Sequence, residues 1–426
     1  MKRRAAIALA LWAALTVVYF ACASRDTILH HTPYNHFAHL AKAWLSGRLD
    51  MLMPPPTYAN GNDFAFHDGK WFVVFPGFPA LLLAPAVAVA ASVEKVRDGQ
   101  IFLWLAGVGP AVLFLALERL RELGRSARDE RENLALAALL GVGTVYFFTA
   151  EQGTVWFAAH VVGVALAALY LLFALDAAHP ILAGVALGLG FWTRAPLLYA
   201  APLFVFEAWR ASSRRGDGGR VAQDLALRLA AFGAPIALAL ALAFAHNRAR
   251  FGDPFDFGYR FLTVGWKARI DTWGLFSPHY LGRNLGVVLT SLPFWARTPT
   301  PEVARLTISI HGLALWITTP LYLFLLWPKR RDATFVALSI TALCVIAPSL
   351  FYQNTGQQQF GWRFSNDVAV FLFAMLAISR PRFSRVFWAV GAFGVAVNLF
   401  GALSFQRSGW ERYYARDPSY SVYPPD

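Results

Sequence analysis

The chain has 426 residues, of which 57% are hydrophobic and only 15% are charged, and its mean hydropathy is +0.45. A soluble domain of this length could not bury so much apolar surface, so the composition excludes a soluble enzyme or binding domain. The formal net charge of +13 does not indicate nucleic acid binding, because half of the Lys and Arg residues lie in five short segments between apolar runs, as is typical of cytoplasmic loops.

The apolar runs predict a bundle of transmembrane helices. Each run holds roughly 20 apolar residues, enough to cross a hydrocarbon core about 30 Å thick. The basic segments, expected in the cytoplasm, are 2–4, 119–131, 210–228, 329–331 and 380–385. About eleven helices then alternate in direction, near 5–23, 101–119, 132–150, 156–175, 180–193, 196–210, 226–245, 308–327, 333–352, 366–379 and 385–404. The expected fold class is all-α, a polytopic transmembrane helix bundle that forms one domain over residues 1–426.

The N-terminus has the basic and then apolar build of a signal peptide. Ala21-Cys22-Ala23 resembles a cleavage or lipidation site, but Tyr19 and Phe20 fit a lipobox poorly. We therefore interpret 5–23 as an uncleaved first helix that begins in the cytoplasm. The eleven crossings then place the C-terminus on the outer side.

Three segments expected on the outer side are too long for simple turns, namely 24–78, 246–307 and the tail 406–426. Loops of this length are usually functional or disordered, and the aromatic residues in these segments favour order. Apolar residues at helical spacing from Phe37 to Leu49 predict an amphipathic juxtamembrane helix that lies along the membrane. The thirteen residues from Pro79 to Ala91 are too few to span and are expected as a half-buried outer helix.

Titratable residues collect in the same outer segments. Nine of the ten histidines lie in the outer loops or at the outer ends of helices, which favours a shared outer site, although histidines also suit membrane interfaces. Among the carboxylates, Asp63 lies between the amphipathic helix and a Pro-rich segment, close to Lys70. The sequence contains no HExxH motif or Cys/His cluster. The outer carboxylates would suffice for a divalent cation, but they identify no metal site.

Two arginines near apolar runs are candidates for anion binding. Arg194, in GFWTRAPLL, is expected at the outer membrane face, where an arginine usually has a phosphate or a carboxylate as its partner. Arg363 and Asp367, in GWRFSND, are four residues apart at the outer start of a helix. They are expected either to pair with each other or to face a ligand together.

Several segments carry a resemblance to a known family. YNHFAHLAKAWLSGRLDM followed by NDFAFHDGKWFVVFPGFPALLLAP resembles the first outer loop of bacterial GT-C-fold membrane glycosyltransferases, which include mannosyltransferase-like and aminoarabinose-transferase-like branches. Further along the chain, the segments that are similar to uncharacterised members of this superfamily are GTVYFFTAEQGTVWFAAH, LAGVALGLGFWTRAPLL, NRARFGDPFDFGYRF and QFGWRFSNDVAVFLF.

The resemblance implies a GT-C-like fold and transfer of a sugar from a polyprenyl-phosphate donor to a lipid or glycan acceptor, at the outer face of the bacterial inner membrane. Members use an acidic residue soon after the first helix, where this chain reads Pro33-Tyr34-Asn35-His36. The resemblance therefore makes Asp63 the first choice for the catalytic base and Asp26 the second.

Other site residues follow from the same resemblance. The cations expected to bind the donor phosphate are Arg194, Arg363 and Lys70, and the residues expected to contact substrate are His36, Asn35 and Asp367. The region 266–298 is expected either to form an aromatic lid or to lie in the aromatic belt of the membrane interface.

Three other functions remain open at this point. A lipid or glycan transporter or flippase would also use an intramembrane arginine, but no internal repeat is visible and the ionisable residues gather at one face. A ligase or polymerase of lipid-linked glycans would also place its site outside. A non-catalytic partner in envelope glycan assembly is compatible with Asn35 in place of an acidic residue.

Overall fold

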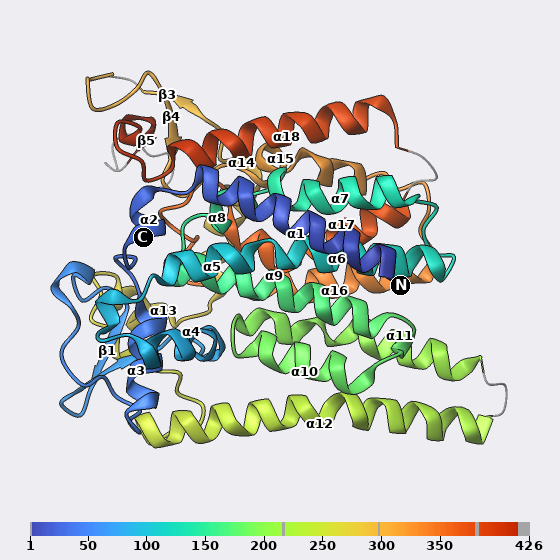
Figure 1. The fold of residues 1–426 in the computed structure, drawn as a ribbon, viewed down its shortest axis with the longest axis horizontal. Coiled ribbons are helices and arrows are strands. Elements are labelled where there is room, and N and C mark those ends of the chain that lie inside the picture. The colour runs from blue at the N-terminus through green and yellow to red at the C-terminus, as the bar shows by residue number, and fades with distance from the viewer. Residues whose placement is uncertain (1, 215–217, 297–298, 380–382, 416–426) are drawn as a thin grey trace.

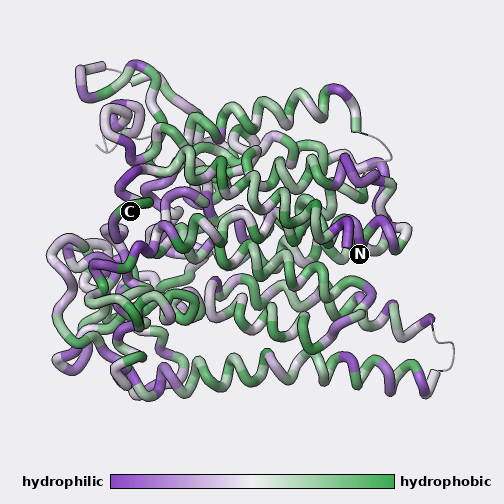
Figure 2. The backbone as a smooth tube through the Cα atoms, viewed as in Figure 1, coloured by the Kyte–Doolittle hydropathy of each residue, from purple (hydrophilic) through white to green (hydrophobic). Residues whose placement is uncertain are grey.

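The computed structural model describes residues 2–214, 218–296, 299–379 and 383–415. In Figure 1 the long helices run side by side, and the N-terminus lies at one end of the bundle. We call this the N-terminal end. The opposite end, the loop end, holds most of the short helices and strands. In Figure 2 the hydrophobic residues follow the middle of the helices and the hydrophilic ones gather at the two ends, as a membrane-spanning bundle requires.

Six helical stretches are long and apolar enough to cross a membrane, judged by length and composition. They are α1 (Lys2–Cys22), α5 with α6 (Asp98–Ala106 and Val108–Glu122), α9 (Val155–Ala174), α12 (Gly218–Phe251), α16 (Ala333–Leu350) and α18 (Arg385–Ser404). Shorter helices run between them, namely α7 (Glu130–Val142), α10 (Pro180–Phe191), α11 (Ala201–Ser213) and α17 (Asn366–Ser379). The described chain is therefore a multi-pass helical bundle.

The short helices of the loop end include the predicted amphipathic helix. They are α2 (Arg25–Leu29), α3 (His36–Leu45), α4 (Phe78–Val89), α8 (Tyr146–Ala150), α13 (Lys267–Trp273), α14 (Leu281–Thr290) and α15 (Leu315–Thr318). Helix α3 forms where it was expected, but part of its polar face is covered, because His36 and His39 are buried beneath residues 58–64 while Lys42 stays half-exposed. Helix α4 is about 18 Å long at 1.5 Å per residue, too short to span.

The all-α prediction missed two small sheets at the loop end. Strands β1 (Phe64–His67) and β2 (Lys70–Val73) form an antiparallel hairpin. Its turn has positive φ at both Asp68 (48°) and Gly69 (73°), the combination that a tight two-residue hairpin needs. A second sheet, in the order β3-β4-β5, joins Phe294–Trp295, Leu306–Ser309 and Tyr414–Ala415.

The predicted helix over 308–327 is wrong as a single element. The segment begins in β4, turns at Gly312 with φ at 86° and continues as α15 and a 3₁₀ helix, Pro320–Leu325. A glycine in the left-handed region and a proline eight residues later interrupt a continuous helix. The predicted tail 406–426 is described only as far as Ala415, and the rest of it lies outside the described residues.

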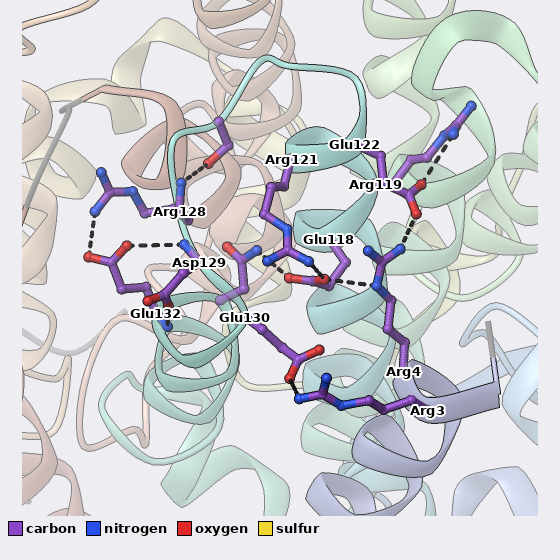
Figure 3. Close-up of polar contacts among 12 residues, drawn as sticks. Arg3, Arg4, Glu118, Arg119, Arg121, Glu122, Arg128, Asp129, Glu130 and Glu132 are labelled. Atoms are coloured by element: carbon purple, nitrogen blue, oxygen red, sulfur yellow. Dashed lines mark hydrogen bonds and ion pairs between the residues drawn. The ribbon is translucent and has the colours of Figure 1, made fainter.

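An ion-pair network connects α1, α6 and α7 at the N-terminal end (Figure 3). Glu118 is buried and accepts from Arg4 (Nε, 2.9 Å), Arg121 (Nη2, 2.6 Å) and the Asn133 amide (2.7 Å). Arg4 also pairs with Glu122. The charge of each of these basic side chains is thus balanced within the protein.

A second network at this end is centred on Glu207 of α11. Its carboxylate accepts from Arg125 (Nη1, 2.6 Å), Arg210 (Nη2, 3.0 Å) and the backbone N–H of Asp176 (2.7 Å). Arg214 pairs with Asp176 at 2.8 Å. These contacts hold the turn after α9 against α11.

Candidate functional site

A cavity of about 750 Å³ lies between the helices and the loop end. Its wall is built from segments far apart in sequence, including the start of the β1–β2 hairpin, α9, the link between α10 and α11, the end of α12, the second loop and residues 347–364. Three of the predicted site residues line it, namely Asp63, Arg194 and Arg363. The structure therefore brings together residues that were selected from three separate motifs.

Asp63 lies immediately before β1 in a left-handed conformation, with φ at 60°. Its Oδ2 accepts a hydrogen bond of 2.8 Å from the indole Nε1 of Trp156 on α9. Burial raises the pKa of Asp63 to about 6, against the lowering effects of the Trp156 hydrogen bond and the charge of Arg363. A carboxylate with this pKa is ionised near neutral pH and is basic enough to accept a proton from a substrate hydroxyl.

Arg194 forms a bidentate ion pair with Asp367 of α17, with Nε to Oδ1 at 3.0 Å and Nη2 to Oδ2 at 2.6 Å. The Nδ1 of the buried His160 lies 3.2 Å from the same Oδ1. The expected pairing of Arg363 with Asp367 is therefore wrong. Arg363 precedes α17 in a 3₁₀ turn and bonds elsewhere, which leaves the carboxylate of Asp367 to Arg194.

Arg363 is 7% exposed and forms no ion pair with any carboxylate among the described residues. It donates to the Gly356 carbonyl, and its guanidinium lies 5.3 Å and 5.4 Å from the rings of Phe364 and Phe157. Burial, followed by the charge of Arg194, lowers the pKa of Arg363 to about 9. The side chain thus brings to the cavity a positive charge that forms no ion pair with a described carboxylate, although the charges of Asp63 and Asp367 act on it from a longer distance.

The other predicted site residues lie outside the cavity wall. Asp26 and Lys70 are exposed, and the nearest ionisable partner of Asp26 is His30 at 3.5 Å. Asn35 is buried, and its Oδ1 accepts from the Tyr58 hydroxyl at 3.1 Å. The ring of His36 stacks on Phe64, and its Nε2 lies 2.9 Å from the Asn62 carbonyl.

Sequence reasoning missed Trp156, Tyr259 and Arg250, which also line the cavity. Burial and the nearby Tyr352 and Asp63 raise the pKa of Tyr259, so its hydroxyl stays protonated and can donate. Each of the three residues lies within a segment that resembles the family, in EQGTVW or in NRARFGDPFDFGYRF. That position was the only signal that could have singled them out.

The structure assigns no metal site. Among the residues it describes, no three His, Cys, Asp or Glu side chains come together in an arrangement that could hold a metal ion. The two described cysteines, Cys22 and Cys344, are both free thiols.

Comparison with known proteins gives a distant structural similarity. No family model matches the sequence, and no curated protein matches it significantly. The solved structures that it resembles include the oligosaccharyltransferase of Archaeoglobus fulgidus with a tethered acceptor peptide (TM-score 0.47, 13% identity, 98% of this chain). The same enzyme with an inhibitory peptide and a dolichol-phosphate gives a TM-score of 0.44 at 13% identity, again over 98% of this chain. This chain spans 56% of the length of that enzyme.

The cavity combines groups with complementary chemistry. Asp63 offers a base, the protonated Tyr259 offers a donor, and Arg363 offers a positive charge. Tryptophan rings from separate segments, Trp44, Trp156 and Trp266, line the same space. This set suits a reaction in which a hydroxyl loses a proton while negative charge develops on a leaving group.

Proposed function

We propose that this protein is a membrane glycosyltransferase that moves a sugar from a polyprenyl-phosphate donor to a hydroxyl of a lipid or glycan acceptor. The observation that carries the proposal is the meeting of Asp63, Arg194 and Arg363 on one cavity wall. A base and a cation that is not held in an ion pair, together in one cavity, are what an inverting displacement from a phosphate leaving group requires.

In the proposed reaction, Asp63 takes the proton of the acceptor hydroxyl as that oxygen attacks the anomeric carbon. The bond from the anomeric carbon to the phosphate oxygen breaks on the opposite face, so the configuration inverts. The transition state has oxocarbenium character. Arg363 stabilises the charge that develops on the leaving phosphate, an effect stronger in the transition state than in the ground state. Arg194, held by Asp367, would orient the phosphate.

The proposed setting is the outer face of the bacterial inner membrane. The chain would cross eleven times, and the whole stretch 313–328, which includes α15 and the following 3₁₀ helix, would make the eighth crossing in place of a helix over 308–327. The N-terminal end would then face the cytoplasm and the loop end the periplasm. The basic residues of the N-terminal end support this orientation.

The test is sugar transfer by the purified protein in nanodiscs, with a panel of radiolabelled polyprenyl-phosphate sugars. Asp63→Asn is compared with the matched control Asp26→Asn, an exposed carboxylate in the same loop. Loss of turnover in Asp63→Asn alone would support the proposal and its base. Equal turnover in both variants would reject Asp63 as the base. Donor binding without turnover in the unmodified protein would indicate a carrier or an assembly partner instead.

A further inference from the structure

A second buried arginine lines the same cavity from a different wall. Arg250, at the loop end of α12, is 8% exposed. It donates through Nη1 to the Val73 carbonyl and through Nη2 to the Asn247 Oδ1, each at 2.9 Å. Its buried Nε has no hydrogen-bond partner. All of its hydrogen-bond acceptors are therefore neutral.

The carboxylates described near Arg250 are engaged with other cations. Asp256, whose charge acts on Arg250, forms its ion pair with Arg260. The charge that acts on Asp63 is that of Arg363. No ion pair joins Arg250 to a carboxylate in the described part of the chain, so its positive charge remains available to a ligand.

His246 lies one helical turn before Arg250, on the same wall of the cavity. It lies four residues before Arg250 on α12, so the two side chains share one face of the helix. Its ring packs edge-on against Trp44 at 5.7 Å, and its buried Nε2 has no hydrogen-bond partner. Both residues line the cavity.

A buried cation without a counter-charge is costly unless an anion joins it. Guanidinium and imidazole N–H groups suit phosphate oxygens, because charge-assisted hydrogen bonds are short and strong. Two buried arginines that form no ion pair with a described carboxylate, Arg250 and Arg363, thus face one cavity from α12 and from the turn before α17.

We propose that Arg250 and His246 form a second anion subsite, which binds a phosphate group separately from the subsite at Arg363. The inference deepens the proposed function and rests on it, because it implies that the cavity holds two phosphates during the reaction. The second phosphate belongs either to a diphosphate-linked donor or to a phosphorylated acceptor.

The experiment measures binding by tryptophan fluorescence, since Trp44 touches His246 and Trp266 also lines the cavity. The protein in nanodiscs is first saturated with polyprenyl monophosphate and then titrated with inorganic phosphate. The second titration is expected to saturate, and Arg250→Gln is expected to weaken it at least tenfold while changing monophosphate affinity less than twofold. Arg363→Gln is expected to weaken monophosphate binding at least tenfold while changing the affinity for inorganic phosphate less than twofold.

Two controls separate the subsite from a structural role of Arg250. Arg228→Gln removes a similar bond on the same helix, from Nη1 to the Ala177 carbonyl at 2.8 Å, together with an ion pair to Asp224. It lies far from the cavity and should leave both titrations unchanged. Arg250→Lys keeps the charge and should retain most of the phosphate binding. Competition of inorganic phosphate with the monophosphate for one site, or unaltered phosphate binding in Arg250→Gln, would overturn the proposal.

Adding polyprenyl diphosphate distinguishes the two possible sources of the second phosphate. If the diphosphate displaces inorganic phosphate from the Arg250 subsite, that phosphate comes from the donor. If the subsite still binds inorganic phosphate beside the diphosphate, the phosphate comes from the acceptor. These measurements need no turnover, so a failure of the glycosyltransferase proposal would appear in the transfer assay and a failure of the subsite would appear here.

Discussion

The arginines of the N-terminal networks and two arginines of the cavity have opposite kinds of partner, although Arg407 at the loop end also pairs with a buried carboxylate, that of Glu151. At the N-terminal end, Arg4 and Arg121 share Glu118, and Arg125 and Arg210 share Glu207 (Figure 3 shows the Glu118 group). At the loop end, Arg363 and Arg250 are buried with neutral acceptors only.

We interpret the arginines that pair with a carboxylate as structural and the two buried arginines without an ion pair as functional. A buried arginine that is matched by a carboxylate contributes to holding helices together, and removing its partner leaves an uncompensated charge. A buried arginine without a partner adds little to stability and is retained for what it binds. The cavity residue Arg194 is intermediate, because Asp367 neutralises it at the edge of the same space. Five predictions would break or sharpen this contrast.

The largest effect is expected at Arg363. Arg363→Gln should lower sugar transfer by about 10³-fold, because the leaving phosphate loses a preorganised positive charge. The unfolding temperature should stay nearly unchanged, since no carboxylate loses a partner. Arg121→Gln serves as the control and should leave transfer intact. A similar loss of transfer in both variants would contradict the contrast between the two ends.

The next largest effect is expected on stability, from Glu207→Gln. This change leaves Arg125 and Arg210 without their buried carboxylate and should cost about 3 kcal/mol of unfolding free energy. Thermal unfolding in nanodiscs measures the loss, and donor binding to the folded fraction should be unaffected. An unchanged unfolding temperature would show that the ion pairs of Glu207 do not stabilise the protein by the predicted amount.

The third prediction concerns pH. In the proposed mechanism Asp63 acts in its ionised form, and burial holds its pKa at about 6, above the ordinary value of 3.8. The kcat/KM for transfer should therefore be level above that pH and fall about tenfold per unit below it. An ordinary carboxyl would keep its activity to about pH 4, so a profile that is flat between pH 6 and 4.5 would exclude Asp63 as the base.

Trp156→Phe should have a smaller effect. The ring is kept, but the N–H that donates to the Asp63 Oδ2 is lost. Because this hydrogen bond favours the ionised form, the pKa of Asp63 should rise, and the acid limb of the pH profile should move upward by about one unit. Transfer at pH 8 should change little. A loss that is equal at every pH would indicate a packing defect rather than a changed pKa.

The smallest effect is expected from Arg3→Gln. The Arg3 side chain is 82% exposed and pairs with Glu130 at 2.6 Å. Exposed ion pairs contribute at most about 1 kcal/mol, so thermal unfolding and transfer should both match the unmodified protein. A large loss of stability would mean that this exposed ion pair contributes as much as the buried ion pairs around Glu118, which would contradict the prediction.

The sequence could predict the parts of the site that depend on residue type and position in the chain. Asp63, Arg194 and Arg363 were selected from their motifs, and the structure places all three on one cavity wall. The position of α3 and the shortness of α4 also followed from periodicity and length. These features could be predicted because periodicity, segment length and motif position depend only on residues that are close together in the sequence.

The sequence could not predict the partners of these residues. Helical spacing suggested that Asp367 pairs with Arg363, whereas tertiary packing brings in Arg194, 173 residues away. Arg250 had no signal beyond its place in the NRARFGDPFDFGYRF segment, since its lack of an ion pair depends on tertiary packing. The β1–β2 hairpin did leave a signal, Asp68-Gly69 between alternating aromatic residues, but the membrane composition favoured an all-helical interpretation.

The ion pair of Arg194 with Asp367 also constrains how the chain is made. Synthesis proceeds from the N-terminus, so Arg194 exists for about 10 to 35 s before Asp367 has been added, at 5 to 20 residues per second over the 173 positions between them. During this interval the nascent chain holds a membrane-proximal cation without its counter-charge. A chain that ends before residue 367 would therefore lack the carboxylate that pairs with Arg194 in the folded protein.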